Sequence, residues 1–476
     1  MATTYDIVVI GAGSGGLGVS LFAARVGLST LLIDRSDEHI GGDCLNFGCV
    51  PSKALIHVSR IVNDAKKAER FGFTVSGQVD IVKVNAYISQ RQSIIRDHEN
   101  ASFLRNTGMD VVLGEASFTS ITSVMVNGKE YAGKKIVLAS GSRPAPLAVP
   151  GAELVRQYNN ESVFDLKDLP KKVLVVGGGP VGIEISQALS QLGSEVTVVH
   201  RRKNILPHDE PDLTRILLSR LESEGIKFQL EAEVQEFTSS SSAIIKTGST
   251  LKRETFDAVF VATGRNITVD NLKLENAGVK VDRGKIVVNK YLQTTNKNIL
   301  VCGDVAGSLL FSHAAEQHAR ILINNLFSPI KKKLINDHMS WVTFTDPEVA
   351  TFGLSEASLK ENNIAYEKVV YDFKDDDRAV IDDYRYGKLI LFLSKASLLR
   401  KQKILGGAMT CPGAGELVQE LILAMREGLS VNALFNKIYP YPVASRVNQL
   451  AIVSHKEKQL TEPLKKLLRI LFAIFN

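Results

Sequence analysis

Residues 7–16 of the chain read Ile7-Val-Val-Ile-Gly11-Ala-Gly13-Ser-Gly-Gly16. The β-branched run predicts a strand, and the glycines after it predict a tight turn. The apolar residues that come next have helical spacing, which predicts a helix that ends at Gly27. Residues 173–193 repeat this plan around Gly177-Gly-Gly179-Pro-Val-Gly182, with a second helix ending at Gly193. In both copies 16 residues separate the first glycine from the glycine that ends the helix (27 − 11 and 193 − 177).

A glycine turn between a strand and a helix lets a pyrophosphate approach the free N–H groups at the helix start. One such turn could be purely structural, but two copies in a strand–helix–strand context favour two dinucleotide-binding sites. The residue at the end of the next strand selects the nucleotide. It is Asp34 in the first copy, where a carboxylate accepts hydrogen bonds from ribose hydroxyls.

In the second copy the equivalent residue is His200, followed by Arg201, Arg202 and Lys203. This basic group would attract the 2′-phosphate of NADPH. We therefore expect NADPH at the second site, with NADH as the less favoured nucleotide. The alternative interpretation is a solvated basic turn.

The composition limits the remaining functions. A chain of 476 residues has room for two to four domains, and 45% apolar with 23% charged residues is typical of a globular protein. The net charge of +6 (57 − 51) is far below the clustered charge that nucleic-acid binding requires. The N-terminus lacks a secretory pattern and no apolar run reaches the roughly 18 residues of a membrane span, so we expect a cytoplasmic protein.

Four cysteines are too few for a disulfide-stabilised scaffold, so a close pair needs a chemical explanation. Cys44 and Cys49 lie in Gly41-Gly-Asp-Cys-Leu-Asn-Phe-Gly-Cys-Val-Pro-Ser-Lys53, directly before a helical pattern. Pro51 suits a first helical turn, so the helix start would lower the pKa of the Cys49 thiol. Such a pair can cycle between disulfide and dithiol. The alternatives are a zinc site, which would need two further ligands, and two inert buried thiols.

The cysteine stretch resembles that of the class I pyridine nucleotide–disulfide oxidoreductases, which include dihydrolipoamide dehydrogenase, glutathione reductase and mercuric reductase. The resemblance continues through Ala139-Ser-Gly-Ser-Arg-Pro144, Ala262-Thr-Gly-Arg265 and Val301-Cys-Gly-Asp304, and it covers almost all of residues 5–450. It implies an α/β fold with two Rossmann-like dinucleotide-binding domains and a C-terminal α+β interface domain for dimerisation. The implied boundaries are 1–150 and 285–337 for the FAD domain, 151–284 for the NAD(P)H domain and 338–455 for the interface domain. Residues 456–476 lie outside the resemblance, and their own pattern predicts a basic amphipathic tail.

The resemblance also implies a route for the electrons. Hydride would pass from NADPH through FAD to a Cys44–Cys49 disulfide, with Cys49 as the thiolate beside the flavin and Cys44 as the thiol that attacks the acceptor. Lys53 and Glu184 would lie near the reactive flavin nitrogen. The residues expected at FAD are Gly11, Gly13, Gly16, Asp34, Gly42, Lys53, Gly141, Gly303 and Asp304. Those expected at NADPH are Gly177, Gly179, Gly182, His200, Arg201, Arg202 and Gly264.

The segment Tyr441-Pro-Val-Ala-Ser-Arg446 departs from the family members that reduce thiol substrates. Those members have His-Pro-Thr-x-x-Glu, in which a histidine from the neighbouring subunit acts as acid–base. Tyr441 replaces that histidine and Arg446 the glutamate, so no group that titrates near neutrality is present there. A tyrosine at this position is similar to mercuric reductase, although the chain lacks that enzyme's C-terminal cysteine pair. We therefore expect a homodimer that reduces Hg(II) or another non-standard acceptor.

Other functions stay open: a dihydrolipoamide dehydrogenase-type or other disulfide reductase, a low-turnover redox sensor, and a membrane-associated quinone reductase. The last follows from the tail, whose basic residues alternate with apolar ones at helical spacing. Such a helix could lie on an anionic membrane or pack on its own dimer. Cys302 and Cys411 have no partner in the sequence and are expected to be buried thiols.

Overall fold

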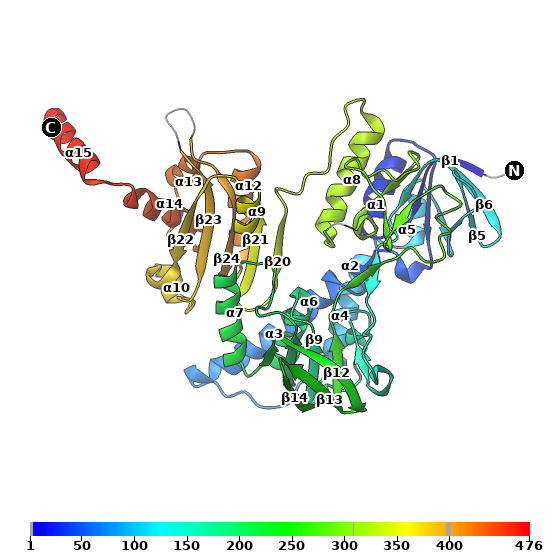
Figure 1. Ribbon diagram of the computed structural model, residues 1–476, viewed down its shortest axis with the longest axis horizontal. Coiled ribbons are helices and arrows are strands. Elements are labelled where there is room, and N and C mark those ends of the chain that lie inside the picture. Colours follow the sequence, from blue (N-terminus) through cyan, green and yellow to red (C-terminus); the bar gives the residue numbers. More distant parts are fainter. Residues whose placement is uncertain (1–2, 308, 397–400) are drawn as a thin grey trace. The chain divides into compact units, whose positions relative to one another are not determined.

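The computed structural model describes residues 3–307, 309–396 and 401–476 (Figure 1). Residues 1, 2 and 308 of the predicted FAD domain and residues 397–400 of the predicted interface domain therefore lie outside the described chain. Contacts divide the chain into two units. The first consists of Met1–Gly177, Ala188–Arg201 and Glu231–Ile335, and the second of Gly178–Gln187, Arg202–Leu230 and Asn336–Asn476. The predicted division into FAD, NADPH and interface domains stays a prediction.

A mainly parallel sheet lies at the centre of the first unit. Its strand β1 (Thr3–Ile10) lies between β2 (Thr30–Asp34) and β6 (Lys129–Leu138), and runs parallel to both. Val8 pairs with Leu31 on one side and with Ile136 on the other. The remaining strands are β3 (Asp110–Leu113), β4 (Ser117–Phe118), β5 (Ser123–Val126) and β19 (Ile299–Val301).

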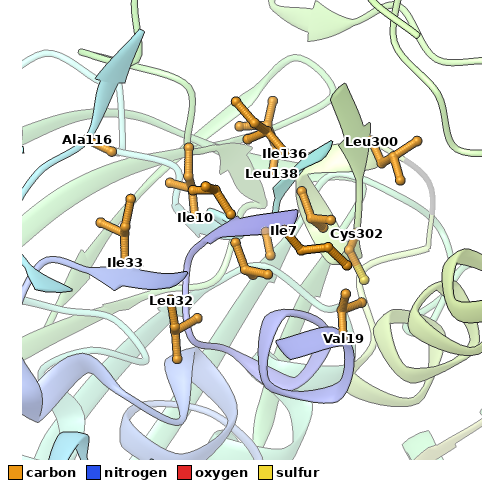
Figure 2. Close-up of a cluster of buried hydrophobic side chains, with 14 of the residues drawn as sticks. Ile7, Ile10, Val19, Leu32, Ile33, Ala116, Ile136, Leu138, Leu300 and Cys302 are labelled. Atoms are coloured by element: carbon orange, nitrogen blue, oxygen red, sulfur yellow. The ribbon is translucent and has the colours of Figure 1, made fainter. Parts of the chain in front are cut away.

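The apolar, β-branched composition of these strands explains why the sheet is buried on both faces. Figure 2 shows part of the resulting core, to which the helix after β1 contributes Val19 and strand β6 contributes Ile136 and Leu138. Strand β19 pairs with β6 in parallel, with Leu300 opposite Val137. The sheet therefore joins segments that are about 160 residues apart in the sequence.

The first glycine turn leads into α1 (Ser14–Arg25), which begins three residues before the predicted start at residue 17. Gly15 and Gly16 are part of the helix, although they continue no apolar pattern, and both are packed so closely that a side chain there would collide with neighbours. A Cβ on Gly15 would lie 2.7 Å from Sγ of Cys302, and one on Gly16 would lie 1.9 Å from the carbonyl oxygen of Gly11. Helix α8 (Ser312–Phe327) packs on α1, with Ala319 facing Gly18.

A second parallel sheet of the first unit contains β10, β9, β15 and β8 in that order. Strands β9 (Lys172–Val176) and β10 (Glu195–His200) are the strands predicted on either side of the second glycine turn, and β10 ends at His200 as expected. The other strands of this part are β8 (Gln157–Tyr158), β15 (Ala258–Val261), β12 (Ala232–Ser239), β13 (Ser242–Thr247) and β14 (Thr250–Thr255).

The cysteine stretch folds into two helices rather than one helix start. Cys44 lies in α2 (Gly42–Asn46), and Cys49 is the first residue of α3 (Cys49–Lys67). Pro51 lies in the first turn of α3, as predicted. The other elements of the first unit are α4 (Ile81–Arg96), α5 (Ala101–Asn106), β7 (Ser142–Pro144), β16 (Arg265–Ile267), β17 (Val281–Asp282) and β18 (Lys285–Ile286).

An antiparallel sheet dominates the second unit, with the strand order β20-β21-β24-β23-β22. These strands are β20 (Ser340–Thr343), β21 (Glu348–Gly353), β22 (Tyr366–Asp372), β23 (Lys388–Ser394) and β24 (Ile404–Cys411). Phe352, Leu391 and Met409 from three of them are fully buried in one apolar core. Cys411 is buried here and Cys302 in the first unit, which confirms the prediction that both are buried thiols.

Some of the remaining helices pack on this sheet, and the others connect its strands or lead to the C-terminus. They are α7 (Pro211–Ser223), α9 (Glu356–Glu361), α10 (Asp377–Ile381), α11 (Ala414–Leu417), α12 (Gln419–Arg426), α13 (Val431–Asn436), α14 (Val447–Lys458) and α15 (Glu462–Phe475). Helix α6 (Pro180–Leu192) belongs to this unit up to Gln187, and β11 (Lys227–Leu230) follows α7. Within the described residues, no helix is both long enough and apolar enough to cross a bilayer.

Candidate active site

The turn between β1 and α1 can be built only with glycine at its first position. Gly11 has a φ of +104°, and a Cβ there would lie 2.3 Å from the carbonyl oxygen of Ala139. Gly13 caps the helix, and Gly42 approaches it so closely that a Cβ on Gly42 would lie 2.6 Å from Cα of Gly13. Glycines of the turn and of the start of α2 thus lie next to the free N–H groups at the start of α1. Because these glycines have no side chains, they form an open surface there, which we call the glycine cradle.

Asp34 lies beside this cradle at the end of β2. Its Oδ2 accepts a hydrogen bond of 2.6 Å from the N–H of Ala12, and its Oδ1 accepts one of 2.7 Å from the N–H of Arg35. Burial raises the pKa of the Asp34 carboxyl, and the two N–H groups oppose that shift. The side chain is therefore held at the position where a ribose hydroxyl would be recognised.

A chain of hydrogen bonds connects Asp304 to the cysteine helix. Ser142 donates to Asp304 at 2.5 Å, and Arg265 donates from Nε to the Ser142 hydroxyl at 2.7 Å. The same guanidinium forms an ion pair of 2.9 Å with Asp43, the residue before Cys44. Burial raises the pKa of the Asp304 carboxyl. Four segments far apart in the sequence are thereby fixed relative to one another.

No pattern in the sequence indicates a role for Ser142, Arg265 or Asp43. Each lies next to a predicted glycine or cysteine, within a motif that the family resemblance covers. Gly141 and Gly264 have φ values of +70° and +147°, which favour glycine. These glycines determine the backbone conformation of the two turns. The side chains of the residues after them, Ser142 and Arg265, form the hydrogen bonds to Asp304 and Asp43.

The two predicted redox cysteines are close together. Cys44 is half-buried in α2, whereas Cys49 is exposed at the start of α3. A hydrogen bond from Cys44 is the main cause that lowers the pKa of Cys49 to about 6, and Ser312 and the charge of Lys53 lower it further. The same hydrogen bond raises the pKa of Cys44. The pair therefore consists of a thiolate and a thiol at neutral pH, with Cys49 as the thiolate.

Ser312 is a contact that no sequence pattern indicates. Its hydroxyl lies 3.3 Å from Sγ of Cys49 although the two residues are 263 positions apart. Ser312 is the first residue of α8, so the packing of α8 on α1 brings it to the cysteine. The hydroxyl can donate to the thiolate, which agrees with its effect on the Cys49 pKa.

The second glycine turn repeats the construction of the first. Gly177 has a φ of +122°, and a Cβ there would lie 2.3 Å from the carbonyl oxygen of Ala262. His200 is buried at the end of β10 and Arg201 after it is exposed. These residues and Gly264 belong to the first unit. The other residues predicted at NADPH, namely Gly179, Gly182 and Arg202, belong to the second unit.

Glu184 is also in the second unit. Its carboxylate is buried and accepts a hydrogen bond of 2.8 Å from the N–H of Phe344. Lys53 is in the first unit, near enough to Cys49 to affect its pKa. The expected place of Lys53 and Glu184 beside the flavin nitrogen stays a prediction.

In the segment that departs from the thiol-reducing pattern, Tyr441 is exposed and the residues from Pro442 to Arg446 are half-buried. The Tyr441 side chain is 67% accessible to solvent, and the guanidinium of Arg446 lies 5.7 Å from the centre of its ring. Residues 441 and 446 thus contact each other through a cation–π interaction.

These sites agree with what comparison with known proteins shows. The family described as "Pyridine nucleotide-disulphide oxidoreductase" matches residues 5–319, and its dimerisation domain matches residues 339–451. The chain belongs to this family of flavin-dependent oxidoreductases. The expected family, fold class and enzyme class are therefore confirmed. The dimerisation-domain match also supports a homodimer.

Several relatives match nearly the whole chain. Dihydrolipoyl dehydrogenase of Chlamydia trachomatis is 32% identical over 94% of this chain and 96% of its own length. Mercuric reductase of Staphylococcus aureus is 28% identical over 94% of this chain and 82% of its own. The solved structure of the HOCl-induced flavoprotein disulfide reductase RclA from Escherichia coli is similar with a TM-score of 0.82 and 26% identity, covering 93% of this chain and 98% of that one.

The residues present fit FAD, the family's cofactor. The glycine cradle has no side chain that would block a pyrophosphate, Asp34 lies beside the cradle at the end of β2, and Asp304 ends a hydrogen-bond chain. Gly11, Gly13, Gly16 and Gly42 would bind through the backbone, and Asp34 and Asp304 through carboxylate oxygens. FAD, when bound, supplies the two-electron relay between a pyridine nucleotide and the cysteine pair.

Proposed function

We propose that this protein uses NADPH and the Cys44–Cys49 pair to reduce a metal ion such as Hg(II), and not a disulfide. The observation that carries the proposal is the pair of Tyr441 and Arg446. A disulfide acceptor needs a proton for its leaving thiolate, and neither a phenol nor a guanidinium donates one readily at neutral pH. A metal ion needs no such proton, and thiolate and phenol groups can ligate it.

The cysteines have separate tasks in this reaction. Cys49, as the thiolate of lower pKa, would remain next to the flavin, where Ser312 and Lys53 stabilise its charge. Cys44 would contact the acceptor, and Tyr441 of the other subunit would supply a further ligand. We also propose Lys53 and Glu184 as residues that surround the reactive flavin nitrogen.

The overall reaction balances without a further reactant. One NADPH and one Hg²⁺ give NADP⁺, H⁺ and Hg⁰, because both the nucleotide oxidation and the metal reduction involve two electrons. Between these steps the cysteine pair alternates between disulfide and dithiol. With Cu(II) the same two electrons would reduce two ions to Cu(I).

The names of some relatives agree with a metal ion as the electron acceptor. One relative is called mercuric reductase, and RclA has been solved as a Cu(II) complex, with 25% identity and a TM-score of 0.81 to this chain. Other relatives are called dihydrolipoyl dehydrogenase, so a disulfide acceptor is the main alternative. A quinone reductase or a redox sensor with little turnover remains a further alternative.

Anaerobic NADPH oxidation by the FAD-loaded protein tests the proposal. We expect Hg(II) in excess thiol or Cu(II) to raise the rate well above the rate without acceptor, and lipoamide and glutathione disulfide to leave it unchanged. Turnover with a disulfide only would contradict the proposal, and turnover with no acceptor would favour the redox sensor.

Two variants of the C-terminal pair sharpen this test. Tyr441→His combined with Arg446→Glu should create disulfide reduction, because an imidazole beside a carboxylate can protonate a thiolate. Tyr441→Phe is the matched control, since it removes the hydroxyl but keeps the ring. It should lower the metal-dependent rate by about tenfold without creating disulfide reduction.

We propose NADPH as the electron donor because Arg201 and Arg202 follow the strand end. Arg201→Gln with Arg202→Gln should lower kcat/KM for NADPH by roughly 10- to 100-fold and leave the value for NADH unchanged, since two charge-assisted contacts to a phosphate are lost. Arg253→Gln, an exposed arginine on β14, is the control. Equal use of both nucleotides by the unmodified enzyme would contradict the assignment.

We further propose that the protein is a cytoplasmic homodimer. We also propose that each chain is divided into domains at the boundaries predicted above. Membrane contact through residues 456–476 is a separate proposal, since it depends on the tail alone.

A further inference from the structure

Helix α15 at the end of the chain exposes an unusual amount of apolar surface. None of its residues is buried, and the exposed fraction reaches 69% for Phe472 and 78% for Phe475. Soluble proteins rarely expose contiguous apolar patches of this kind without a binding partner. The large apolar side chains concerned are Leu464, Leu467, Leu468, Ile470, Leu471, Phe472, Ile474 and Phe475.

Apolar and charged side chains are fully separated around this helix. An α-helix turns by about 100° per residue, so the apolar residues form a face about 200° wide. Lys465, Lys466 and Arg469 lie on the opposite side, together with Glu462. Ala473 and Asn476 complete the polar side.

The width of the apolar face favours a planar partner. A second helix covers a stripe nearer to 100° or less, so pairing with another α15 would leave much of the face in water. A membrane interface covers a wide face at once. The polar side carries three positive charges against one negative charge, which complements anionic lipid headgroups.

The helix is too short to span the bilayer. With 14 residues it is about 21 Å long, whereas the hydrocarbon core is about 30 Å thick. We propose that α15 lies in the plane of an anionic membrane surface, with its apolar face towards the acyl chains and its lysines and arginine at the headgroups. The proposal goes beyond the proposed reaction and holds whichever acceptor the enzyme reduces.

Co-sedimentation of the full-length, FAD-loaded protein with vesicles tests this proposal. Leu468→Glu and Ala473→Glu make a matched pair, because each adds one carboxylate to α15 but on opposite faces. With vesicles of phosphatidylcholine and phosphatidylglycerol, Leu468→Glu should lower the partition coefficient at least about tenfold relative to Ala473→Glu.

The basic residues are tested in the same assay. The triple variant Lys465→Gln, Lys466→Gln and Arg469→Gln should bind anionic vesicles roughly a hundredfold more weakly, since each charge near an anionic surface contributes severalfold. Binding of the unmodified chain to pure phosphatidylcholine should be weak and should not change in the triple variant.

Three results would overturn the proposal. The first is that the unmodified chain does not bind anionic vesicles, and the second is that the two glutamate variants bind equally well. The third is that Leu468→Glu changes the oligomeric state of the protein but not its binding to vesicles. The last result would show that α15 packs on a second copy. Light scattering measures the oligomeric state, and the bound flavin content and NADPH oxidation of each variant show that the enzyme is folded.

Discussion

At the scale of single residues, Cys49 shows how neighbours set the reactivity of a thiol. Its pKa of about 6 compares with an ordinary value of 9.0, because Cys44, Ser312 and Lys53 all favour the thiolate. Spacing alone suggested only the contribution of the helix start. The largest contribution instead comes from Cys44, which lies on a different helix.

Alkylation of the reduced protein should follow this pKa. We expect the rate of Cys49 modification by iodoacetamide to rise with pH through a midpoint near 6, because only the thiolate reacts. Ser312→Ala should move the midpoint up by about one unit, since one hydrogen bond to the thiolate is lost. Ser328→Ala, at the other end of α8, should leave it unchanged. A midpoint above 8 in the unmodified protein would contradict the assignment.

His318 is a second residue whose environment fixes its charge. It is fully buried on α8, and its Nδ1 accepts a hydrogen bond of 3.2 Å from the N–H of Gly303. Its Nε2 has no hydrogen-bond partner among the described residues. Burial lowers the pKa of His318 to about 4, so the ring stays neutral while it supports the backbone before Asp304.

This burial predicts a pH dependence of stability. The unfolded chain binds a proton at His318 below about pH 6.5 and the folded chain only below about 4. The free energy of unfolding should therefore fall by about 3 kcal/mol from this residue as the pH falls from 6.5 to 4. The variant His318→Asn keeps a hydrogen-bond acceptor for the N–H of Gly303 but has no titrating ring. In this variant the fall of about 3 kcal/mol in the free energy of unfolding should be absent. Parallel pH profiles for the two proteins in urea unfolding would contradict the prediction.

At the scale of elements, the start of α2 and the glycine turn depend on each other. Gly42 has a φ of +63° and its Cβ would collide with Gly13, whereas a Cβ on Gly13 would lie at an ordinary 3.7 Å from Gly42. Gly42 is therefore required by the protein backbone. Gly13 has room for a side chain in the protein itself, so the role we propose for it is to leave space for the pyrophosphate of FAD.

The two glycines should respond differently to alanine. Gly42→Ala should lower the Tm of the flavin-free protein by several degrees, because backbone must shift. Gly13→Ala should leave that Tm unchanged but weaken FAD binding by tenfold or more, measured by the recovery of flavin fluorescence on dissociation. An equal loss of Tm in both variants would show that Gly13 also has a structural role.

At the scale of the whole molecule, sequence and structure agree best where the pattern is local. The strands ending at Asp34 and His200 and the exposed tail helix follow from periodicity and glycine spacing over short windows. At the start of α1, Gly15 packs closely on Cys302, which lies far away in the sequence, and the apolar spacing gives no sign of that contact.

The unpredicted part of the candidate site consists of long-range contacts. Arg265 reaches Asp43 over 222 positions, and Ser312 reaches Cys49 over 263. The glycines and cysteines carry a recognisable spacing, but nothing in the spacing tells which serine or arginine will face them. The packing of α8 on α1 and the pairing of β16 with β7 place these two residues, and neither follows from the spacing of the motifs.

The late position of β19 has a consequence for synthesis on the ribosome. Gly11, Asp34 and the cysteines emerge first, but Asp304 and Ser312 follow only after the whole second sheet of the first unit has been translated. Strand β19 is also needed to extend the first sheet beside β6. A nascent chain that ends before residue 300 therefore has an unfinished first sheet, and Asp304 and Ser312 are absent beside Ser142 and Cys49. If the FAD contacts proposed above hold, stable retention of the cofactor would begin only late in translation.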